Sequence, residues 1–373
     1  CGLCPDHEQH TCIGLIEVTN ECGLKCPVCY ANAGNGPPLR LESIEKMMDF
    51  YQAAEHSKAE LLQISGGEPT AHPQIIEILQ MAKKKKFKYV MLNTNGIRLA
   101  SDTVFVKELS LLCPGFEVYL QFDGLLPKTH EYLRGKDLTD VKKRAITNLS
   151  EYNIPITLVT TVENDINDQE LGSIFTYALN TKCIRGINFQ PVAYFGRTKD
   201  TKINNRSTLT GILQKLEKQT NGMLQKNDFL PLPCHPERVA FTYLYKNGGS
   251  FVPITRGMNA EQYVPLIKNT FTFTPEDIMQ KLLQCNDNNC MSLIKDLLPL
   301  VPLSYFAKSV KQKQDYINEN IFRISITSFV DIYNFDMKSM KKECVHIITP
   351  DLKRIPFSAY NMFHRKKYQI QNI

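Results

Sequence analysis

The sequence predicts an α/β fold: a partial (β/α)6 parallel barrel with an appended α+β region at its C-terminal end. Strand-like apolar runs and helix-like stretches alternate from residue 13 to about residue 220. Six βα units in succession are typical of a parallel sheet with right-handed crossovers. From residue 221 the alternation breaks, and β-like alternation returns at Ile321. We therefore expect a barrel over 13–220 and an α+β region over 221–373.

Six short apolar runs, each followed by turn-forming residues, are predicted to be the barrel strands. They are Ile13–Thr19, Leu61–Ser65, Tyr89–Asn93, Glu117–Phe122, Ile156–Val162 and Ile187–Val192. Helical patterns follow these strands near 41–56, 73–84, 102–112, 137–151, 168–181 and 208–219. In such sheets the catalytic and binding residues lie at the carboxyl ends of the strands, and we expect the functional site there.

The C-terminal region begins with a proline-rich segment over 231–236 that we expect to be rigid and to cross the surface. A strand over Val239–Tyr245 is predicted after it, then helices over 275–284 and 291–298. Near the end of the chain, a hairpin is predicted to pair Cys344–Thr349 with Arg354–Phe357.

The composition restricts the class of protein. A chain of 373 residues that is 43% hydrophobic and 22% charged is globular, and a net charge of +6 is too small to indicate a nucleic-acid partner. No apolar run is long enough to span a bilayer, and no secretory signal is visible, so we expect a cytoplasmic protein. The chain begins at Cys1 without Met, so we expect that an N-terminal piece was removed or left out. Its 12 cysteines indicate metal binding, because disulfides are disfavoured in a reducing compartment.

Three of these cysteines, Cys22, Cys26 and Cys29, form a C-x3-C-x2-C loop directly after the first predicted strand. Three thiolates can hold three irons of a [4Fe–4S] cluster and leave the fourth iron open to a substrate or cofactor. Two alternatives are three ligands of a zinc site and free core thiols. The C-x3-C spacing, the aromatic Tyr30 and the preceding strand favour the cluster.

Polar and glycine-rich segments follow the next strands. Gly66-Gly67-Glu68-Pro69 comes after the second strand, Asn93 and Asn95 end the third, and Gln121 and Asp123 end the fourth. Arg134 lies beyond the fourth strand, and Gln190 ends the sixth. Because the carboxyl ends of parallel strands share one edge of the sheet, we expect these residues to lie near the cysteine loop.

The cysteine loop, followed one strand later by Gly-Gly-Glu-Pro, resembles the signature of the radical S-adenosylmethionine (SAM) enzymes. The resemblance implies a [4Fe–4S] cluster whose open iron chelates SAM. One electron, from a donor such as ferredoxin or flavodoxin, then yields a 5′-deoxyadenosyl radical that abstracts hydrogen from an unactivated C–H bond. It also implies a barrel of radical SAM type.

The resemblance also implies roles for individual residues. Tyr30 is expected to pack near adenine, and Glu68 to face the methionine ammonium, which the backbone approaches at Gly66 and Gly67. Asn93 and Asn95 are expected to face the ribose, with an Asx-turn as the alternative for both. Arg134 is expected to pair either with the SAM carboxylate or with a structural acid. The full set of expected cofactor contacts is Tyr30, Gly66, Gly67, Glu68, Asn93, Asn95, Gln121, Asp123, Arg134 and Gln190.

A second metal motif precedes the barrel. Cys1, Cys4 and Cys12, in the segment 1–12, have a C-x2-C-x7-C spacing that suits a second iron–sulfur cluster or a mononuclear iron or zinc. The fourth ligand must come from far along the chain, and we favour Cys344 over Cys234. Structural thiols are the alternative.

Several further segments, among them residues 189–197 and 333–336, are similar to the archaeal tetraether lipid synthase group, whose members were also described as dihydropterin methyltransferases. This similarity implies C–C coupling or methylation of a lipid or other small molecule, and a lipid substrate implies peripheral contact with a membrane. The chain departs from the group at Glu237–Val239 and Ser358, where we expect cysteines, so one auxiliary cluster is expected to be missing. The alternatives are a peptide-modifying maturase and a non-catalytic iron–sulfur or zinc protein.

Overall fold

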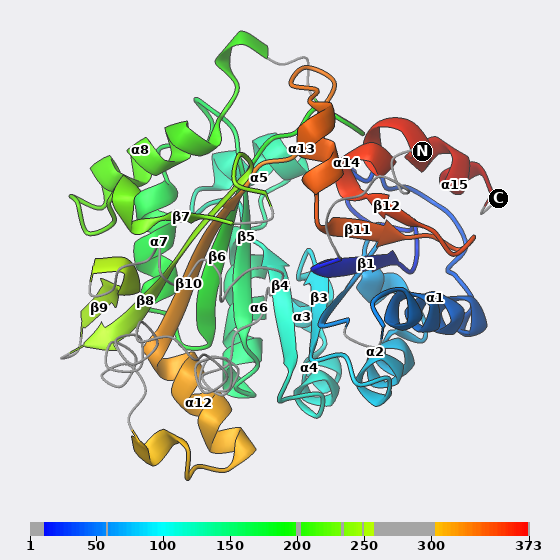
Figure 1. Cartoon of the computed structure of the whole chain (residues 1–373), viewed down its shortest axis with the longest axis horizontal. Helices are drawn as coiled ribbons and strands as arrows, with labels where there is room; N and C mark the ends of the chain where they lie inside the picture. Colours follow the sequence, from blue (N-terminus) through cyan, green and yellow to red (C-terminus); the bar gives the residue numbers. More distant parts are fainter. Residues whose placement is uncertain are drawn as a thin grey trace, which may run out of the picture.

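The computed structural model describes residues 11–56, 59–198, 203–232, 235–247, 250–256 and 303–371. Its strands form one sheet of twelve, and the sequence-based prediction of an α/β partial barrel is confirmed (Figure 1). The predicted helices over 275–284 and 291–298 lie outside the described residues. Among the described residues, no helix is long and apolar enough to cross a membrane.

The six predicted barrel strands are present, and each pairs in parallel with the next. Each is an apolar run of five to eight residues that is buried on both faces, as expected of a parallel sheet covered by helices. Their bounds are β1 (Ile13–Glu17), β2 (Leu61–Ser65), β3 (Tyr89–Thr94), β4 (Phe116–Gln121), β5 (Ile156–Val162) and β6 (Ile184–Pro191).

The helices cover the outer face of this sheet (Figure 1). The sequence predicts six of them and misses two short ones, α3 and α5, which are only five and eight residues long. The bounds are α1 (Leu41–Ala54), α2 (Ile75–Lys84), α3 (Ile97–Ser101), α4 (Thr103–Ser110), α5 (Pro127–Arg134), α6 (Thr139–Glu151), α7 (Leu171–Leu179) and α8 (Leu209–Gln219).

The C-terminal region extends the same sheet at both edges. β10 pairs in parallel with β6, and β11 pairs in parallel with β1, so that eight parallel strands lie side by side. The predicted hairpin is confirmed as the antiparallel pair of β11 and β12. The remaining bounds are β7 (Leu230–Pro231), β8 (Val239–Asn247), β9 (Ser250–Pro253), α12 (Val310–Asn320), β10 (Ile321–Thr327), α13 (Met337–Lys342), β11 (Val345–Ile348), β12 (Arg354–Pro356), α14 (Phe357–Ala359), a π-helix (Tyr360–His364) and α15 (Arg365–Gln371).

Successive side chains of each strand point to opposite faces of the sheet, and the two faces have different roles. On β3, Val90 and Leu92 point outward and pack with the helices in the main core, whereas Met91 and Asn93 point into the barrel. The open side of the barrel is bridged by side chains, because Leu232 lies in one cluster with Cys12 and Cys344. The interior of the barrel is therefore a cavity that has side chains on this side as well.

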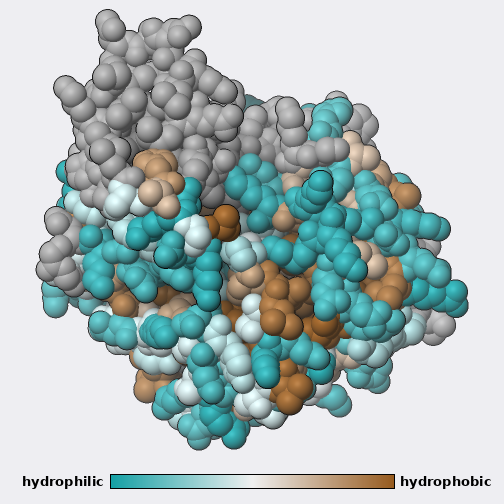
Figure 2. Space-filling model, turned by 90° about the horizontal axis from the view of Figure 1, so that it is seen from below, coloured by the Kyte–Doolittle hydropathy of each residue, from teal (hydrophilic) through white to brown (hydrophobic). Residues whose placement is uncertain are grey.

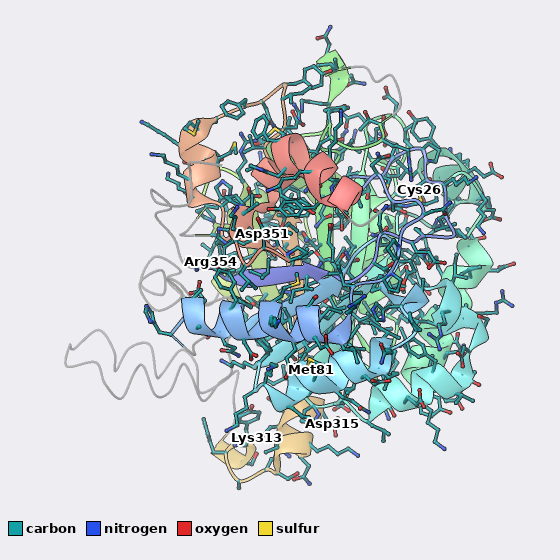
Figure 3. All side chains as sticks on the ribbon, turned by 90° about the vertical axis from the view of Figure 1, so that its right-hand side faces the viewer. Cys26, Met81, Lys313, Asp315, Asp351 and Arg354 are labelled. Atoms are coloured by element: carbon teal, nitrogen blue, oxygen red, sulfur yellow. The ribbon has the colours of Figure 1, made fainter. Side chains whose placement is uncertain are left out.

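The two ends of the barrel differ. Figure 3 places Cys26 at one end and Lys313 and Asp315, on α12, at the other. Because the cysteine loop follows β1 directly, its end is the one where the strands finish. In the view of Figure 2, hydrophilic residues cover most of the described surface and the largest apolar group lies near the centre. Polar outer faces are typical of helices that pack on a sheet.

Candidate active site

The three predicted cluster ligands come together at the carboxyl end of β1. Cys22, Cys26 and Cys29 line one cavity, and Cys26 is buried while the other two are partly buried. The Sγ atom of Cys22 accepts a hydrogen bond from the Leu24 amide at 3.4 Å, and the positive charge of the Arg134 guanidinium acts on the thiol of Cys26. A donor aimed at sulfur and a nearby cation both suit a negatively charged cluster.

Burial controls the protonation of these thiols. It raises the pKa of Cys22 to about 11 and also raises the pKa of Cys26, so without a metal both are neutral. Iron must therefore displace the protons on binding. Three cysteine thiols that line one cavity are the kind of donor set that holds iron–sulfur clusters, and in this respect the residues fit a [4Fe–4S] cluster.

The glycine pair after β2 lies directly against the start of the cysteine loop. A Cβ atom on Gly66 would lie 2.3 Å from the Thr19 carbonyl oxygen, and one on Gly67 would lie 2.4 Å from that of Glu21. Gly66 also has φ of 144°, a conformation that residues with side chains rarely adopt. Only glycine at both positions lets the two loops meet, and this contact forms one wall of the cavity.

A second clamp on the cysteine loop comes from residues after β6, which the sequence did not identify as functional. The backbones of Cys29 and Arg197 exchange two hydrogen bonds, at 2.8 and 2.9 Å. The Arg197 side chain also donates from Nε to the Cys26 carbonyl at 3.1 Å. Gly196, with φ of 71°, leaves no room for a Cβ atom against the Cys29 carbonyl. The loop is thus held from both sides.

Glu68 joins the loops after β2 and β3. Its Oε1 accepts hydrogen bonds from Thr70 Oγ1 and Thr94 Oγ1, both at 2.7 Å, and its Oε2 accepts one from the Asn95 amide at 2.7 Å. The side chain is buried but lines the cavity. Glu68 thus connects the loop after β2 to the loop after β3. Its Oε2 atom retains a lone pair that is available to a cationic ligand.

Asn93 and Asn95 behave differently from one another. The Oδ1 of Asn95 accepts a hydrogen bond from the Ile97 amide at 2.9 Å, so Asn95 forms the Asx-turn that was the alternative prediction. Asn93 donates to Ser65 Oγ at 3.2 Å, and its buried Oδ1 has no hydrogen-bond partner among the residues that the structure describes. Asn93 therefore keeps an unused acceptor inside the cavity.

Arg134 pairs with Asp123. Two hydrogen bonds of 2.6 Å join the groups, and Arg134 is 9% exposed while Asp123 is fully buried. Although burial opposes ionisation, the guanidinium keeps the pKa of Asp123 below its ordinary value. The prediction left the partner of Arg134 open, and the structure shows the acid within the protein. Arg134 still lines the cavity, but Asp123 does not.

The cavity at the cysteine loop continues into the barrel. Tyr30, Asn93, Gln121 and Gln190 line both the cluster cavity and the interior cavity. Burial raises the pKa of Tyr30 to about 12, so this phenol is neutral at physiological pH. A ligand at the cysteine loop and a second molecule in the barrel would meet at these residues.

The interior cavity has a polar and an apolar wall. The polar wall comes from consecutive parallel strands, and the apolar wall from β1, β11 and β8 at the open side. The polar lining includes Gln63, Asn93, Tyr119, Gln121, Asn188, Gln190, Ser325 and Thr327, and the apolar lining includes Ile13, Leu15, Leu232, Val239, Phe241 and Val345.

Part of the predicted second metal site is visible. Cys12 and Cys344 are both buried, and the Cys12 amide donates to the Cys344 carbonyl at 2.9 Å. Cys1, Cys4 and Cys234 lie outside the described residues. Ser358, where we expected a cysteine in this family, is fully buried and donates from Oγ to Glu343 at 3.0 Å. The ligand set of this second site stays a prediction.

Comparisons with known proteins give four findings. Residues 16–178 match the Radical SAM superfamily. The chain is 32% identical over 416 aligned residues to 7,8-dihydro-6-hydroxymethylpterin dimethyltransferase of Methanocaldococcus jannaschii, covering 99% of this chain and 80% of that protein. It is 29% identical over 166 residues to the sporulation killing factor maturation protein SkfB of Bacillus subtilis, covering 44% of this chain and 39% of that protein. Among solved structures, SuiB of Streptococcus suis bound to its precursor peptide SuiA superposes with a TM-score of 0.49 at 18% identity, covering 58% of this chain and 47% of that chain.

Proposed function

This chain belongs to the radical SAM superfamily, and from that membership we propose that it is a methyltransferase-type radical SAM enzyme acting on a small heterocyclic substrate. Cys22, Cys26 and Cys29 would hold the [4Fe–4S] cluster. When bound, the cluster supplies one electron to SAM, which releases a 5′-deoxyadenosyl radical able to take hydrogen from carbon. The observation that carries the proposal is the single cavity shared by the three thiols and the Gly66-Gly67 turn.

The protein's own groups would bind and orient SAM. The backbone at Gly66 and Gly67 allows close approach of the methionine part, and Glu68 Oε2 offers an acceptor to its ammonium. Tyr30 offers a flat face at the junction of the two cavities, near the expected position of adenine. Arg134 keeps its charge through its pair with Asp123 and faces the same cavity.

The lining of the interior cavity supports a heterocyclic substrate over an alkyl chain. The side chain of Gln63 is 7% exposed and makes no hydrogen bond with any described residue. Asn93 Oδ1 is likewise without a partner. An alkyl chain would leave these amides desolvated and unpaired, which costs roughly 1–3 kcal/mol for each group. A ring with amide and amino groups on its edge, such as a pterin, would pair with them and place its faces against the apolar wall.

The relatives support the same choice of substrate. The pterin dimethyltransferase aligns with nearly the whole chain, whereas the peptide maturation protein aligns with less than half of it. Lipid coupling, with peripheral membrane contact, and peptide modification are the alternatives. A ferredoxin or flavodoxin remains the proposed electron donor.

Anaerobic reconstitution with iron and sulfide, followed by SAM and dithionite, tests the proposal. We expect 5′-deoxyadenosine in the products, and addition of 7,8-dihydro-6-hydroxymethylpterin should give a methylated pterin by mass spectrometry. Cys26→Ser is the variant expected to lose activity, and Cys183→Ser is its matched control, since Cys183 is a partly buried thiol that does not line the cavity. A cluster-filled sample that releases no 5′-deoxyadenosine would contradict the proposal and favour a non-catalytic iron–sulfur protein.

A further inference from the structure

Lys142, in the first half of α6, is buried beneath the active-site edge. It is 1% exposed, and the sequence places it in the run Lys142-Lys143-Arg144, where a solvated position is the ordinary expectation. Its Nζ donates a hydrogen bond to the Asn95 carbonyl at 2.7 Å. Among the described residues it forms no salt bridge. A buried ammonium held by a carbonyl alone is unusual, because such groups are rarely buried without an acidic partner.

The surroundings of Lys142 place it under the cysteine loop. Its helix neighbours Leu138 and Val141 pack in one cluster with Leu24 and Cys26. The carbonyl that it binds belongs to Asn95, which lines the cluster cavity together with Cys26. The ammonium therefore lies behind residues that contact the cysteine loop or line its cavity.

Among the described residues, three charged side chains act on Lys142: Asp123, Arg134 and Glu68. Cys26 adds a fourth charge only when its thiol is ionised. Asp123 is paired with Arg134, and Glu68 accepts hydrogen bonds from neutral donors only. Before any cluster is present, the positive charges of Lys142 and Arg134 balance the negative charges of Asp123 and Glu68. Without Lys142, this edge would carry an excess negative charge.

We infer that Lys142 raises the reduction potential of the cluster by placing a buried positive charge beside its ligands. The inference rests on the proposed function, since it requires the cluster. A cube with three thiolates is negative when oxidised and gains a further negative charge when one electron is added. A nearby cation therefore stabilises the reduced form more than the oxidised form, and low polarity strengthens the effect. The cation favours the redox state from which SAM is cleaved.

The cost of burying Lys142 supports a role of this kind. Burial lowers the pKa of Lys142 to about 8, which means that the surroundings of this side chain disfavour its charged form. A methionine would fill the same space without this cost of burying a charge. A purely structural role as an anchor for Asn95 would need only a hydrogen-bond donor, and glutamine supplies one without charge.

The test is a one-electron potentiometric titration of the cluster-filled protein with dithionite and mediators, monitored by electron paramagnetic resonance. At the wild-type midpoint, we expect the ratio of reduced to oxidised cluster to fall at least tenfold in Lys142→Gln and Lys142→Met. That change corresponds to a shift of about 59 mV to more negative potential. Lys142→Arg, which keeps the charge, and Lys143→Met, an exposed position on the same helix, should keep the wild-type potential.

The outcomes separate the inference from the proposed function. A wild-type potential in cluster-filled Lys142→Gln would overturn the inference and leave Lys142 as an anchor for Asn95. If Lys142→Met does not fold, the comparison of Lys142→Gln with Lys142→Arg decides the question. Wild-type protein that takes up no cluster would contradict the proposed function instead.

Discussion

Arg365 and Glu17 join the C-terminal helix to the end of the first strand across 348 residues of sequence. Two hydrogen bonds, at 2.7 and 3.0 Å, link the guanidinium to the carboxylate. Arg365 also lies over the ring of Tyr30, with 5.7 Å between the guanidinium carbon and the ring centre. The C-terminal segment thus packs against the residue that follows the last cysteine of the loop. The pair is largely buried, with side-chain exposures of 5% for Arg365 and 14% for Glu17.

Arg365→Met should therefore lower the free energy of unfolding by about 3–5 kcal/mol, because it leaves a buried carboxylate without its partner. Lys366→Met, an exposed neighbour, should change it by less than about 0.5 kcal/mol. The chain has no Trp, so urea unfolding is best followed by circular dichroism. If Arg365→Met and Lys366→Met change the free energy of unfolding equally, the ion pair between Arg365 and Glu17 does not stabilise the fold.

Gly67→Ala should disrupt the site without affecting the outer core. Its added methyl group would meet the carbonyl oxygens of Asn20 and Glu21 at 2.5 and 2.4 Å, and backbone cannot move aside as a flexible side chain can. We expect SAM affinity to fall at least tenfold, or about 1.4 kcal/mol. Gly34→Ala is the matched control, since nothing lies within 4 Å of its Cβ position. Isothermal titration of the cluster-filled proteins with SAM gives the comparison, and equal affinities would refute the close-approach argument.

Gln63→Met should weaken pterin binding roughly fivefold, since a hydrogen bond between buried neutral groups contributes about 1 kcal/mol. The fluorescence of 6-hydroxymethylpterin reports binding directly in a protein that has no Trp. Gln80→Met replaces an exposed amide on α2 and should bind as the wild type does. If the Gln63 variant binds the pterin as tightly as wild type while SAM cleavage persists, another substrate class must be sought.

If Cys12 and Cys344 are ligands of the predicted second metal site, removal of either one should affect that site alone. Cys12→Ser and Cys344→Ser are expected to lower the iron or zinc content of each chain and to leave 5′-deoxyadenosine formation by the Cys22–Cys29 cluster measurable. Metal analysis and Mössbauer spectroscopy give the count. Cys113→Ser, which alters a partly buried thiol elsewhere, is the control. Unchanged metal content in both variants would show that these two cysteines are structural.

Glu117 should make stability depend on acid pH. Although burial opposes it, Arg185 and Arg323 hold the pKa of Glu117 below its ordinary value of 4.5. Its stabilising effect is therefore complete above pH 4.5 and is lost as the pH falls through the folded value. Glu117→Gln should be less stable than wild type by about 3–5 kcal/mol at neutral pH, and the difference should shrink in acid.

Urea unfolding in a pH series from 7 down to about 3 provides the measurement for Glu117. Glu151→Gln, at an exposed position, should follow the wild-type curve at every pH. A difference between Glu117→Gln and wild type that stays constant over the whole series would mean that the carboxylate is not ionised in the folded protein.

Patterns in the sequence were enough to predict the barrel strands, most of the helices, the C-terminal hairpin and the cysteine loop. Each depends on local properties: apolar periodicity, turn residues, and the spacing of three thiols. It missed α5, because Pro127–Arg134 contains only one strongly apolar position, Leu133, and so has no periodic stripe. The sequence also does not reveal that β10 and β11, in the predicted C-terminal region 221–373, pair with the barrel strands β6 and β1.

The partners of the charged and polar groups could be identified only in the folded protein. The sequence left Arg134 between a ligand and an internal acid, and the structure pairs it with Asp123. It placed Lys142 in a charged run, and packing against the cysteine loop buries it. These outcomes depend on distances between residues far apart in the chain. A sequence pattern records which groups need partners, but burial and geometry decide which partners they find.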